Sequence, residues 1–406
     1  MEQEIGYALD LEESKLFDLF NNLNKDISHH SSKDDICTPM ECVKLMVEYI
    51  PSFFWNKPVI KVLDPCSGNG NFGAYLTRKT HPDNIWYNDI NEKRLENCRK
   101  ILNPTHISKE DFFNISKFFD EGWDLIIGNP PYSGGGNKNR SLANDFIEHS
   151  IDLLNDCGYL CFITPNNFMT YNNNNTTLKK LLNNGSFVVI DNDAKKYFPK
   201  VGSSFTIFLW QKSVFNNKTL IKNTFLKRDF QTDVIIPKNA KFIPLYISNT
   251  VFSIFSKIIK AERNAFDYRC DLHNFTQKAK LSDIEDAIFR FKTIHTAKKT
   301  RYANIKQDIF DKWVIIIPLS TYYVPYIVTN SNVTQSVGYI AFDTKQMAED
   351  YLRIITKPEY KLAVHLTRYG NFNNIKILRH LDFEGNHDFD DNELVTIQEL
   401  SKLIKY

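Results

Sequence analysis

Short apolar segments that end in polar residues recur along the first half of the chain. They predict six strands, with bounds at Val59–Leu63, Ile85–Asn88, Asp124–Gly128, Tyr159–Thr164, Phe187–Asp191 and Ser204–Gln211. Patterns with helical spacing lie between them, such as Glu92–Leu102 and Asp145–Leu154. Strands that alternate with helices indicate a doubly wound, parallel α/β sheet with helices on both faces. Ligands of such sheets bind at the carboxyl ends of the strands, so the polar residues there are the candidates for a site.

The regular alternation ends near Lys212–Lys227, and we place a domain boundary there. We expect a polar, partly helical N-terminal extension over residues 1–36, a first domain over 37–213 and a second domain over 214–406. Two domains suit a chain of 406 residues, because one domain usually takes roughly 100 to 200. The low-complexity tract Asn172–Asn175 predicts a loop.

The composition is that of a globular protein, with 42% hydrophobic and 24% charged residues, which excludes a wholly disordered or fibrous chain. No run of 18 or more apolar residues is present, so we expect no membrane-spanning helix. The N-terminal sequence is acidic and lacks the apolar core of a secretory signal. Seven cysteines without disulfide-framework spacing indicate free thiols in a reducing compartment, and we expect a cytoplasmic protein.

The net charge of +2 conceals an asymmetry. Residues 1–214 carry 22 Lys and Arg against 27 Asp and Glu, a net charge of −5. Residues 215–381 carry 26 Lys and Arg against 14 Asp and Glu, a net charge of +12. A basic second domain points to a polyanionic partner such as nucleic acid. A solvated, Lys-rich surface is the alternative.

The first candidate for chemistry is the sequence VLDPCSGNGNF at the end of the first predicted strand. Gly68 and Gly70 allow the backbone of the turn to approach a ligand closely. Asp64 is suited to a cationic group such as an ammonium, and a pyrophosphate-binding loop would avoid an acid there. A second acid, Asp89, follows 25 residues later, as binding of a ribose diol requires. Alone, this motif is also compatible with a plain strand–turn–helix in which the Asp is a cap.

The second candidate is Asn129-Pro130-Pro131-Tyr132, directly after the third predicted strand. The prolines fix the backbone and remove two N–H donors, so the carbonyls there have a rigid geometry. The Asn129 side-chain oxygen and a neighbouring carbonyl offer two acceptors for the hydrogens of an exocyclic NH₂ group. Tyr132 offers a flat face on which a base can stack. A proline-capped turn with a half-buried Tyr is the alternative.

Together, DPCSGNGNF and NPPY resemble the S-adenosylmethionine-dependent amino-methyltransferases, in particular the gamma-class adenine-N6 DNA methyltransferases of restriction-modification systems. Asp64 and Asn129 lie 65 residues apart, in the order of that family and at strand ends predicted to be adjacent. The resemblance covers residues 35–213 closely and the remainder loosely. It implies a Rossmann-like methyltransferase sheet, a C-terminal α+β target-recognition domain and S-adenosylmethionine as cofactor.

The resemblance also assigns site residues, matched motif by motif. The residues that it implies for the cofactor are Thr38, Asp64, Cys66, Gly68, Gly70, Asp89, Ile90, Asp111, Phe112, Asn129, Pro131 and Phe146. The residues that it implies for catalysis are Asn129, Pro130, Tyr132 and Phe198. Phe198 matches an aromatic that contacts the flipped base, with a buried strand-end Phe as the alternative.

The chemistry expected of these residues is orientation of a poor nucleophile. The lone pair of an adenine amine is delocalised into the ring. If Asn129 and the Pro130 carbonyl accept hydrogen bonds from both N–H groups, the nitrogen becomes more tetrahedral and its lone pair faces the methyl donor. A duplex hides this amine, so the base must be flipped out of the stack.

The basic second domain is expected to contact double-stranded DNA through phosphates and base edges. The candidates are Arg290, Lys298, Lys299, Arg301, Tyr302, Arg368, Asn371 and Asn373. For each of them, a solvated surface position is the alternative. A cognate restriction endonuclease acting as a separate protein is compatible with this function, and the sequence does not distinguish that case from a solitary enzyme.

Other functions receive less support. A methyltransferase acting on RNA or on a protein glutamine shares the NPPY motif but usually carries its extra domain ahead of the core. A cytosine-N4 product and a non-catalytic DNA-binding subunit are further alternatives. No metal is expected, because the pairs Cys37/Cys42 and Cys157/Cys161 lack zinc-site spacing and matching His.

Overall fold

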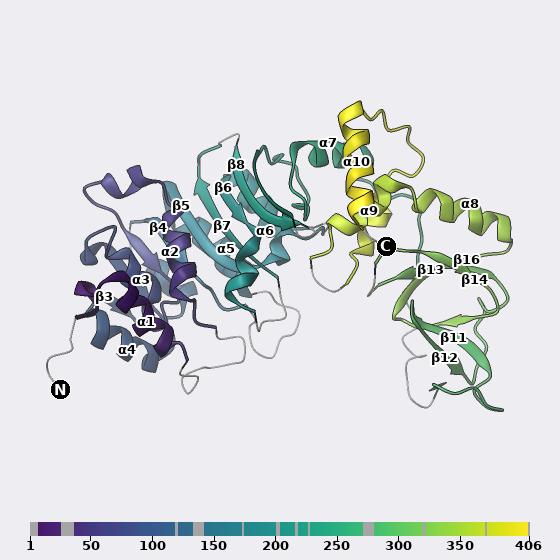
Figure 1. The fold of residues 1–406 in the computed structure, drawn as a ribbon, viewed down its shortest axis with the longest axis horizontal. Helices are drawn as coiled ribbons and strands as arrows, with labels where there is room; N and C mark the ends of the chain where they lie inside the picture. The colour runs from purple at the N-terminus through teal and green to yellow at the C-terminus, as the bar shows by residue number, and fades with distance from the viewer. Residues whose placement is uncertain are drawn as a thin grey trace. The chain divides into compact units, whose positions relative to one another are not determined.

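A computed structural model describes most of the chain as two compact units (Figure 1). The described residues are 7–25, 36–117, 121–132, 142–172, 174–199, 204–215, 218–225, 228–270, 280–319, 322–369 and 372–404. The first unit consists of Met1–Phe168 and Asn175–Ala240, and the second of Met169–Asn174 and Lys241–Tyr406. The boundary that we expected between residues 213 and 214 thus lies inside the first unit.

One nine-stranded sheet forms the centre of the first unit, in the order β3-β2-β1-β4-β5-β7-β6-β8-β9. Its strands are β1 (Val62–Asp64), β2 (Ile85–Asn88), β3 (His106–Ser108), β4 (Trp123–Gly128), β5 (Leu154–Pro165), β6 (Gly185–Asp191), β7 (Phe205–Lys212), β8 (Thr219–Phe225) and β9 (Arg228–Val234). β1 pairs in parallel with β4, so the two sequence motifs do follow adjacent strands. Leu125, Ile126 and Ile127 of β4 are all fully buried, which shows that both faces of the sheet are covered.

The sheet is not wholly parallel as we expected. β7 runs antiparallel to both of its neighbours, β5 and β6 (Figure 1). β8 and β9 then extend the same sheet, and Ile221 of β8 is fully buried. These two strands, TLIKNTF and RDFQTDV, consist mostly of polar residues, so they lack the continuous apolar pattern of the inner strands.

Helices of the first unit precede or join these strands. They are α1 (Glu13–Leu23), α2 (Met40–Glu48), α3 (Asn71–Leu76), α4 (Glu92–Leu102), α5 (Leu142–Leu153) and α6 (Thr176–Asn184), with 3₁₀ helices η1 (Tyr7–Asp10), η3 (Ser52–Asn56), η4 (Pro82–Asn84), η5 (Phe112–Lys117), η6 (Asn166–Met169) and η7 (Asn192–Tyr197). α1 contacts α2, α2 contacts α3, and α5 contacts α6.

The N-terminal segment is not a separate extension where the structure describes it. Leu16 and Phe20 of α1 are buried in the core that α2 and the sheet also form. The spacing of four residues places both side chains on one face of the helix. α1 is therefore part of the first unit.

The second unit is an α+β arrangement, as predicted. Its strands are β10 (Leu281–Ser282), β11 (Phe291–Thr296), β12 (Lys299–Ala303), β13 (Trp313–Pro318), β14 (Tyr326–Val328), β15 (Asn332–Val333) and β16 (Val337–Phe342). Its helices are α7 (Asn249–Ile258), α8 (Lys345–Ile355), α9 (Pro358–Leu366) and α10 (Asp391–Leu403), with the 3₁₀ helix η9 (Ile375–His380).

Two small sheets organise the second unit. The orders are β10-β12-β11-β15 and β14-β13-β16. α8 lies against the three-stranded sheet, and α7, α9 and α10 pack on one another (Figure 1). In the part of the chain that the structure describes, no helix is long and apolar enough to cross a membrane.

Candidate active site

Asp64 ends β1 and is fully buried. Its Oδ1 accepts a hydrogen bond of 3.4 Å from the Cys66 amide. Its Oδ2 has no hydrogen-bond partner among the described residues. Burial raises the pKa of the Asp64 carboxyl well above its usual value, and the nearby Asp89 raises it further. A buried carboxyl with an unused oxygen would be stabilised by a cationic group.

The loop between β1 and α3 is held by Asp89, which follows β2. Its Oδ2 accepts a 2.8 Å hydrogen bond from the Gly68 amide, and its Oδ1 accepts one of 2.8 Å from the Asn91 amide. Gly68 and Gly70 have φ angles of +55° and +92°, in the left-handed region that favours glycine. A Cβ at Gly70 would lie 2.6 Å from Cδ1 of Leu102. Asp89 therefore shapes the loop, and its contact with a ribose stays a prediction.

Asn88 joins the carboxyl ends of β1, β2 and the segment after β3. Its Nδ2 donates to the carbonyls of Pro65 (3.2 Å) and Glu110 (3.0 Å). Its Oδ1 accepts from the Ser108 hydroxyl (2.8 Å) and the Glu110 amide (3.1 Å). The side chain thus uses both donors and both acceptors. We did not predict this positioning residue, because only the strand order brings its partners together.

Four residues predicted to hold the cofactor lie at or after the ends of β2 and β3 and on α5. Ile90 follows Asp89 and is 70% exposed, unusual for an isoleucine beside a buried strand. The rings of Phe112 and Phe146 stack, with centroids 4.6 Å apart and planes 17° from parallel. Asp111 is exposed, and its Oδ1 accepts from the Phe113 amide at 3.1 Å. The structure thus brings Phe112 and Phe146 together.

Asn129 follows β4, and three hydrogen bonds fix its side chain. Its Nδ2 donates to the Ile36 carbonyl (3.0 Å) and the Thr38 hydroxyl (3.1 Å). A backbone carbonyl only accepts, so the NH₂ group must face Ile36 and Oδ1 must face the other way. Oδ1 accepts a 2.6 Å hydrogen bond from the Tyr132 hydroxyl. Among the described residues, Asn129 therefore presents an oriented acceptor with one lone pair still unused.

Tyr132 and Phe198 lie against a shared neighbour, Phe205. The ring centroids are 5.2 Å apart for Tyr132 and Phe205, and 5.4 Å apart for Phe198 and Phe205. Phe198 is only 3% exposed and belongs to the core, which is the alternative that we gave for it. Burial raises the pKa of Tyr132, so its hydroxyl remains a donor to Asn129. Contact between Phe198 and a base stays a prediction.

A chain of hydrogen bonds links the glycine loop to Asn129. Asn71, the first residue of α3, donates to the Thr38 carbonyl at 2.8 Å, and Asn24 after α1 donates to the same carbonyl at 3.3 Å. The Cys66 thiol donates to the Asn129 carbonyl at 3.2 Å. Thr38, which we predicted to hold the cofactor, is therefore placed to orient Asn129. Of the two prolines, Pro130 is buried and Pro131 is exposed.

Several residues predicted to bind DNA have partners inside the second unit. Asp283 pairs with Lys299 (3.2 Å) and with Nε of Arg301 (2.7 Å). The Arg290 guanidinium lies 5.1 Å from the ring centre of Phe291. Lys298 is exposed on the turn between β11 and β12, and Tyr302 is half-buried on β12. These contacts leave fewer cations available for phosphate than the sequence suggested.

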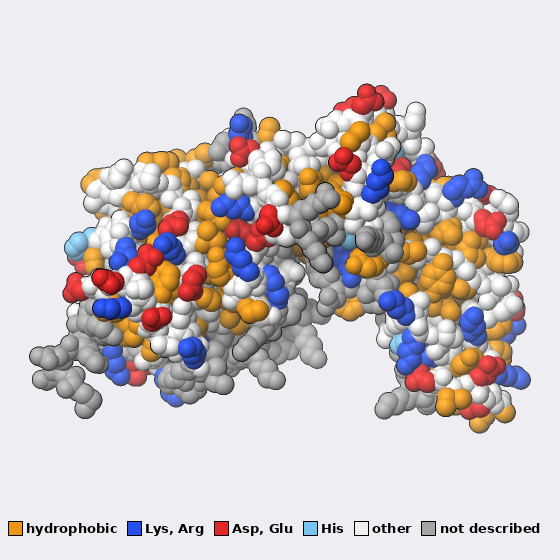
Figure 2. Space-filling view, viewed as in Figure 1, with side chains coloured by type: hydrophobic (Ala, Val, Ile, Leu, Met, Phe, Trp, Pro, Cys, Tyr) orange, Lys and Arg blue, Asp and Glu red, His pale blue; other side chains and the backbone are white. Residues whose placement is uncertain are grey.

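The remaining candidates are constrained in a similar way. Arg368 lies 5.5 Å from the ring centre of Tyr322. Asn373 is buried, and its Nδ2 donates to the Pro318 carbonyl at 2.8 Å. Asn371 lies outside the described residues. On the face shown in Figure 2, Lys and Arg alternate with Asp and Glu across the first unit, without an area of one sign. Within the described residues, no group of His, Cys, Asp and Glu is arranged to hold a metal ion.

Residues 71–198 match the model of a family described as Eco57I restriction-modification methylase. The chain is 27% identical over 281 residues to the type II methyltransferase M.HincII of Haemophilus influenzae, covering 64% of the chain and 53% of that protein. It is 32% identical over 168 residues to an uncharacterized adenine-specific methylase of Mycoplasma pneumoniae, covering 38% and 39%. It is 30% identical over 125 residues to the ribosomal RNA small subunit methyltransferase C of Haemophilus influenzae, covering 30% and 38%. The chain spans at most 53% of the length of these relatives.

Among solved structures, a DrdV–DNA complex matches with a TM-score of 0.56 and 11% identity, covering 91% of this chain and 57% of that chain. At this identity the likeness shows a shared fold. Together with the family match, it confirms the predicted methyltransferase fold, and the matched segment is similar to restriction-modification methylases. S-adenosylmethionine is the cofactor that this family and this fold imply.

The strand ends of the first unit fit that cofactor. The unpartnered oxygen of buried Asp64 suits its ammonium group. Gly68 and Gly70 hold the loop in a left-handed turn that residues with side chains rarely adopt. Exposed Ile90 offers an apolar face for the adenine. These features require no metal and no further cofactor for a ligand to bind.

Proposed function

We propose that the protein is a DNA methyltransferase of the restriction-modification type that methylates the N6 amine of adenine in double-stranded DNA. The support is the family match over residues 71–198, together with the acceptor geometry at Asn129. Adenine as the target, the flipped base and the roles of individual residues are parts of this proposal.

The observation that carries the proposal is the oriented Oδ1 of Asn129. Its NH₂ group is held by Ile36 and Thr38, so the oxygen cannot rotate away without breaking two hydrogen bonds. An acceptor fixed before the substrate arrives costs no reorganisation during the reaction. Asn129 Oδ1 would accept a hydrogen bond from one N–H of an exocyclic amine, and the Pro130 carbonyl would accept one from the other N–H.

S-adenosylmethionine, when bound, supplies an already activated methyl group. The protein must then orient the amine and stabilise the positive charge that develops on it. Asn129 and the Pro130 carbonyl do this as neutral acceptors, and they form no tight ion pair with the product. Asp64 holds the ammonium of the cofactor, and Asp89 holds the glycine loop and the ribose.

Flipping a base out of a duplex costs a few kcal/mol, which pocket contacts must offset. Tyr132 is half-buried next to Asn129 and can offer a ring face to the base. Phe198 is buried and packs against Phe205, so it contacts the base only if its side chain becomes exposed.

The test is methyl transfer to unmethylated double-stranded DNA, followed by mass spectrometry of the digested nucleosides. We expect N6-methyladenine from the wild type. Asn129→Ala should lower kcat by roughly 10²–10³-fold. Thr38→Val should lower kcat about tenfold by releasing the Asn129 amide, whereas Thr38→Ser, which keeps the hydroxyl, should retain most activity. Full activity of Asn129→Ala would refute the mechanism.

An RNA substrate is the second candidate, because one relative is a ribosomal RNA methyltransferase. The same assay distinguishes the two. If methylated nucleosides form in RNA and none form in duplex DNA, the substrate is RNA and not adenine in DNA. Cytosine-N4 methylation of the DNA would keep the class of enzyme and change the target base.

A further inference from the structure

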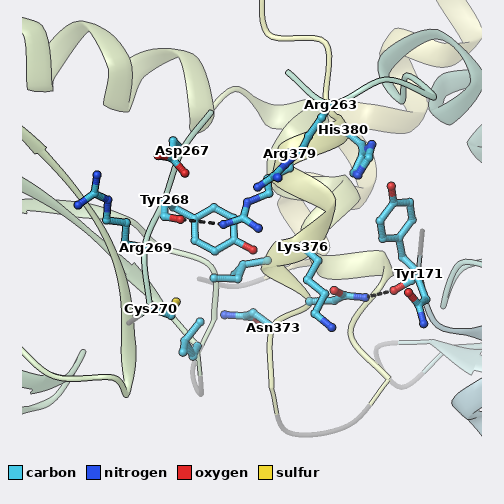
Figure 3. Close-up of a pocket in the computed structure, with 14 residues that line it drawn as sticks. Tyr171, Arg263, Asp267, Tyr268, Arg269, Cys270, Asn373, Lys376, Arg379 and His380 are labelled. Carbon is cyan, nitrogen blue, oxygen red and sulfur yellow. Dashed lines mark hydrogen bonds between the residues drawn. The ribbon is translucent and has the colours of Figure 1, made fainter. Parts of the chain in front are cut away.

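The second unit contains a pocket of about 800 Å³ that is lined by four separated parts of this unit (Figure 3). Three of them are segments within residues 171–172, 263–270 and 373–380, and the fourth is Leu319. The volume is in the range of sites that hold small molecules or parts of larger ones. Of the residues that we predicted to bind DNA and that the structure describes, only Asn373 lines it.

The pocket is rich in cations. Arg263, Arg269, Lys376 and Arg379 line it, against one acid, Asp267. Arg263 and Lys376 are exposed, and no acidic side chain in the described part of the chain forms an ion pair with either. This differs from the β11–β12 hairpin, where Asp283 neutralises two of the cations.

Two further groups at the pocket hold hydrogen-bond donors without acceptors. The Arg379 guanidinium lies 4.2 Å from the ring centre of Tyr268 and donates to the Tyr268 carbonyl at 2.9 Å, which fixes its position. Its buried Nε has no partner among the described residues, and neither has the hydroxyl of Tyr171, which is 2% exposed. Figure 3 shows the Tyr171 ring beside that of His380, with centroids 5.9 Å apart. Buried donors without acceptors are rare in native proteins and indicate a ligand that brings acceptor oxygens.

We propose that this pocket binds a phosphate of the DNA backbone. A phosphodiester supplies a negative charge and acceptor oxygens, which match the cations and the donors at the pocket. The volume of the pocket is large enough to hold the sugar next to the phosphate as well. This inference rests on the proposed function, and it assigns the main phosphate contact to Arg263, Lys376 and Arg379 instead of to the hairpin.

The test compares DNA affinities of full-length proteins over a range of salt concentrations. Arg263→Gln/Lys376→Gln removes the two exposed cations and leaves Arg379 and its contacts with Tyr268 intact. A charge-matched control is Lys312→Gln/Lys345→Gln, whose lysines pair with Asp343 and Glu349 outside the pocket. Thermal unfolding checks that both double variants are folded.

Each lost phosphate contact lowers the slope of log K against log salt by about 0.9. For the pocket variant, the slope should therefore be about 1.8 less negative than for the wild type. The variant should bind DNA roughly 50-fold more weakly at 0.1 M salt. The control should keep the slope of the wild type. An unchanged slope in the pocket variant, or an equal loss in the control, overturns the proposal.

Further measurements separate this site from the proposed function. If the wild type forms no N6-methyladenine but the pocket variant still loses DNA affinity, the phosphate site stands and the function fails. If methylation is normal and the slope is unchanged, the function stands and the site fails. Thymidine monophosphate serves as a competitor. Displacement of bound DNA only at millimolar concentrations supports a backbone contact, whereas micromolar displacement that the pocket variant abolishes means that the site holds a free nucleotide.

Discussion

At the scale of single residues, the buried carboxyl of Asp64 is suited to binding a cationic group but lowers the stability of the protein when that group is absent. It is fully buried, its Oδ2 has no partner among the described residues, and burial raises its pKa. A carboxyl held in this way destabilises the protein without cofactor, because the folded state disfavours the ionised form. Such a site favours cofactor binding and lowers the stability of the cofactor-free protein.

We predict that Asp64→Asn abolishes cofactor binding and raises the free energy of unfolding of the cofactor-free protein. The Asn keeps an acceptor for the Cys66 amide and carries no charge. We expect this gain in the free energy of unfolding at neutral pH, because burial raises the pKa of the Asp64 carboxyl in the folded protein. Chemical denaturation with a parallel binding titration measures both effects.

The raised pKa of Asp64 also predicts how the stability difference between the wild type and Asp64→Asn changes with pH. Above the usual Asp pKa of 3.8, the unfolded chain has lost the proton that folded Asp64 still holds. The wild type should therefore lose stability relative to Asp64→Asn as pH rises from there to the raised pKa. A difference that stays constant with pH, or that narrows over this interval, contradicts the assignment.

How far single residues can be predicted depends on where their partners lie in the sequence. Asp64 and Asn129 were found because each follows an apolar strand within a recognisable motif. The roles of Asn88 and Thr38 in positioning were not found, because Asn88 bonds to Ser108, 20 residues away, and Thr38 bonds to Asn129, 91 residues away. Phe198 has the same sequence neighbours whether it faces a base or the core, and the structure places it in the core.

At the scale of elements, the glycine loop is tightest where it meets α4. A Cβ at Gly70 would meet both Cδ1 of Leu102 (2.6 Å) and Sγ of Cys98 (2.9 Å). A Cβ at Gly68 would meet only the Arg94 side chain, at the ordinary distance of 3.5 Å. Both glycines have positive φ angles, so substitution at each adds backbone strain, and only Gly70 adds a steric clash.

We predict that Gly70→Ala costs about 2–4 kcal/mol of stability, from strain and overpacking together. Gly68→Ala should cost about 1 kcal/mol, from strain alone. Denaturant unfolding of the two variants measures the difference. Equal losses would show that the contact with α4 is not what restricts the loop.

The elements were predictable where burial gives a regular pattern. β2 and α4 have the bounds that the sequence indicated, because β2 is a buried run and α4 has helical spacing between polar ends. β3 reads His-Ile-Ser and is half-buried, so it has no apolar signal. β8 and β9 were not predicted for a related reason, since polar residues interrupt both strands and leave no continuous apolar run.

At the scale of the whole molecule, each unit has an apolar core of its own. The core of the first unit joins the sheet to α1, α2 and α3, and the second unit has a separate cluster around Val314 and Val333. The residues that we propose for the cofactor site all lie in the first unit. Binding there should stabilise that unit more than the other.

We predict two transitions in calorimetric unfolding, of which only one responds to S-adenosylmethionine. A cofactor concentration of 100 times its Kd should add about 2.7 kcal/mol to the stability of the first unit. Gly70→Ala should lower the same transition, while Arg263→Gln/Lys376→Gln leaves it unchanged. A single transition that moves with all of these changes would mean that the units unfold as one.

Met169–Asn174 belongs to the second unit although its sequence neighbours on both sides belong to the first. Its carbonyls accept from residues far along the chain, with Met169 bonded to Ile243 at 2.9 Å and Tyr171 to Asn374 at 2.6 Å. Recombination that exchanges residues 241–406 between related genes would leave this segment behind. A working chimera must therefore carry residues 169–174 and 241–406 from the same parent, which takes three crossovers instead of one.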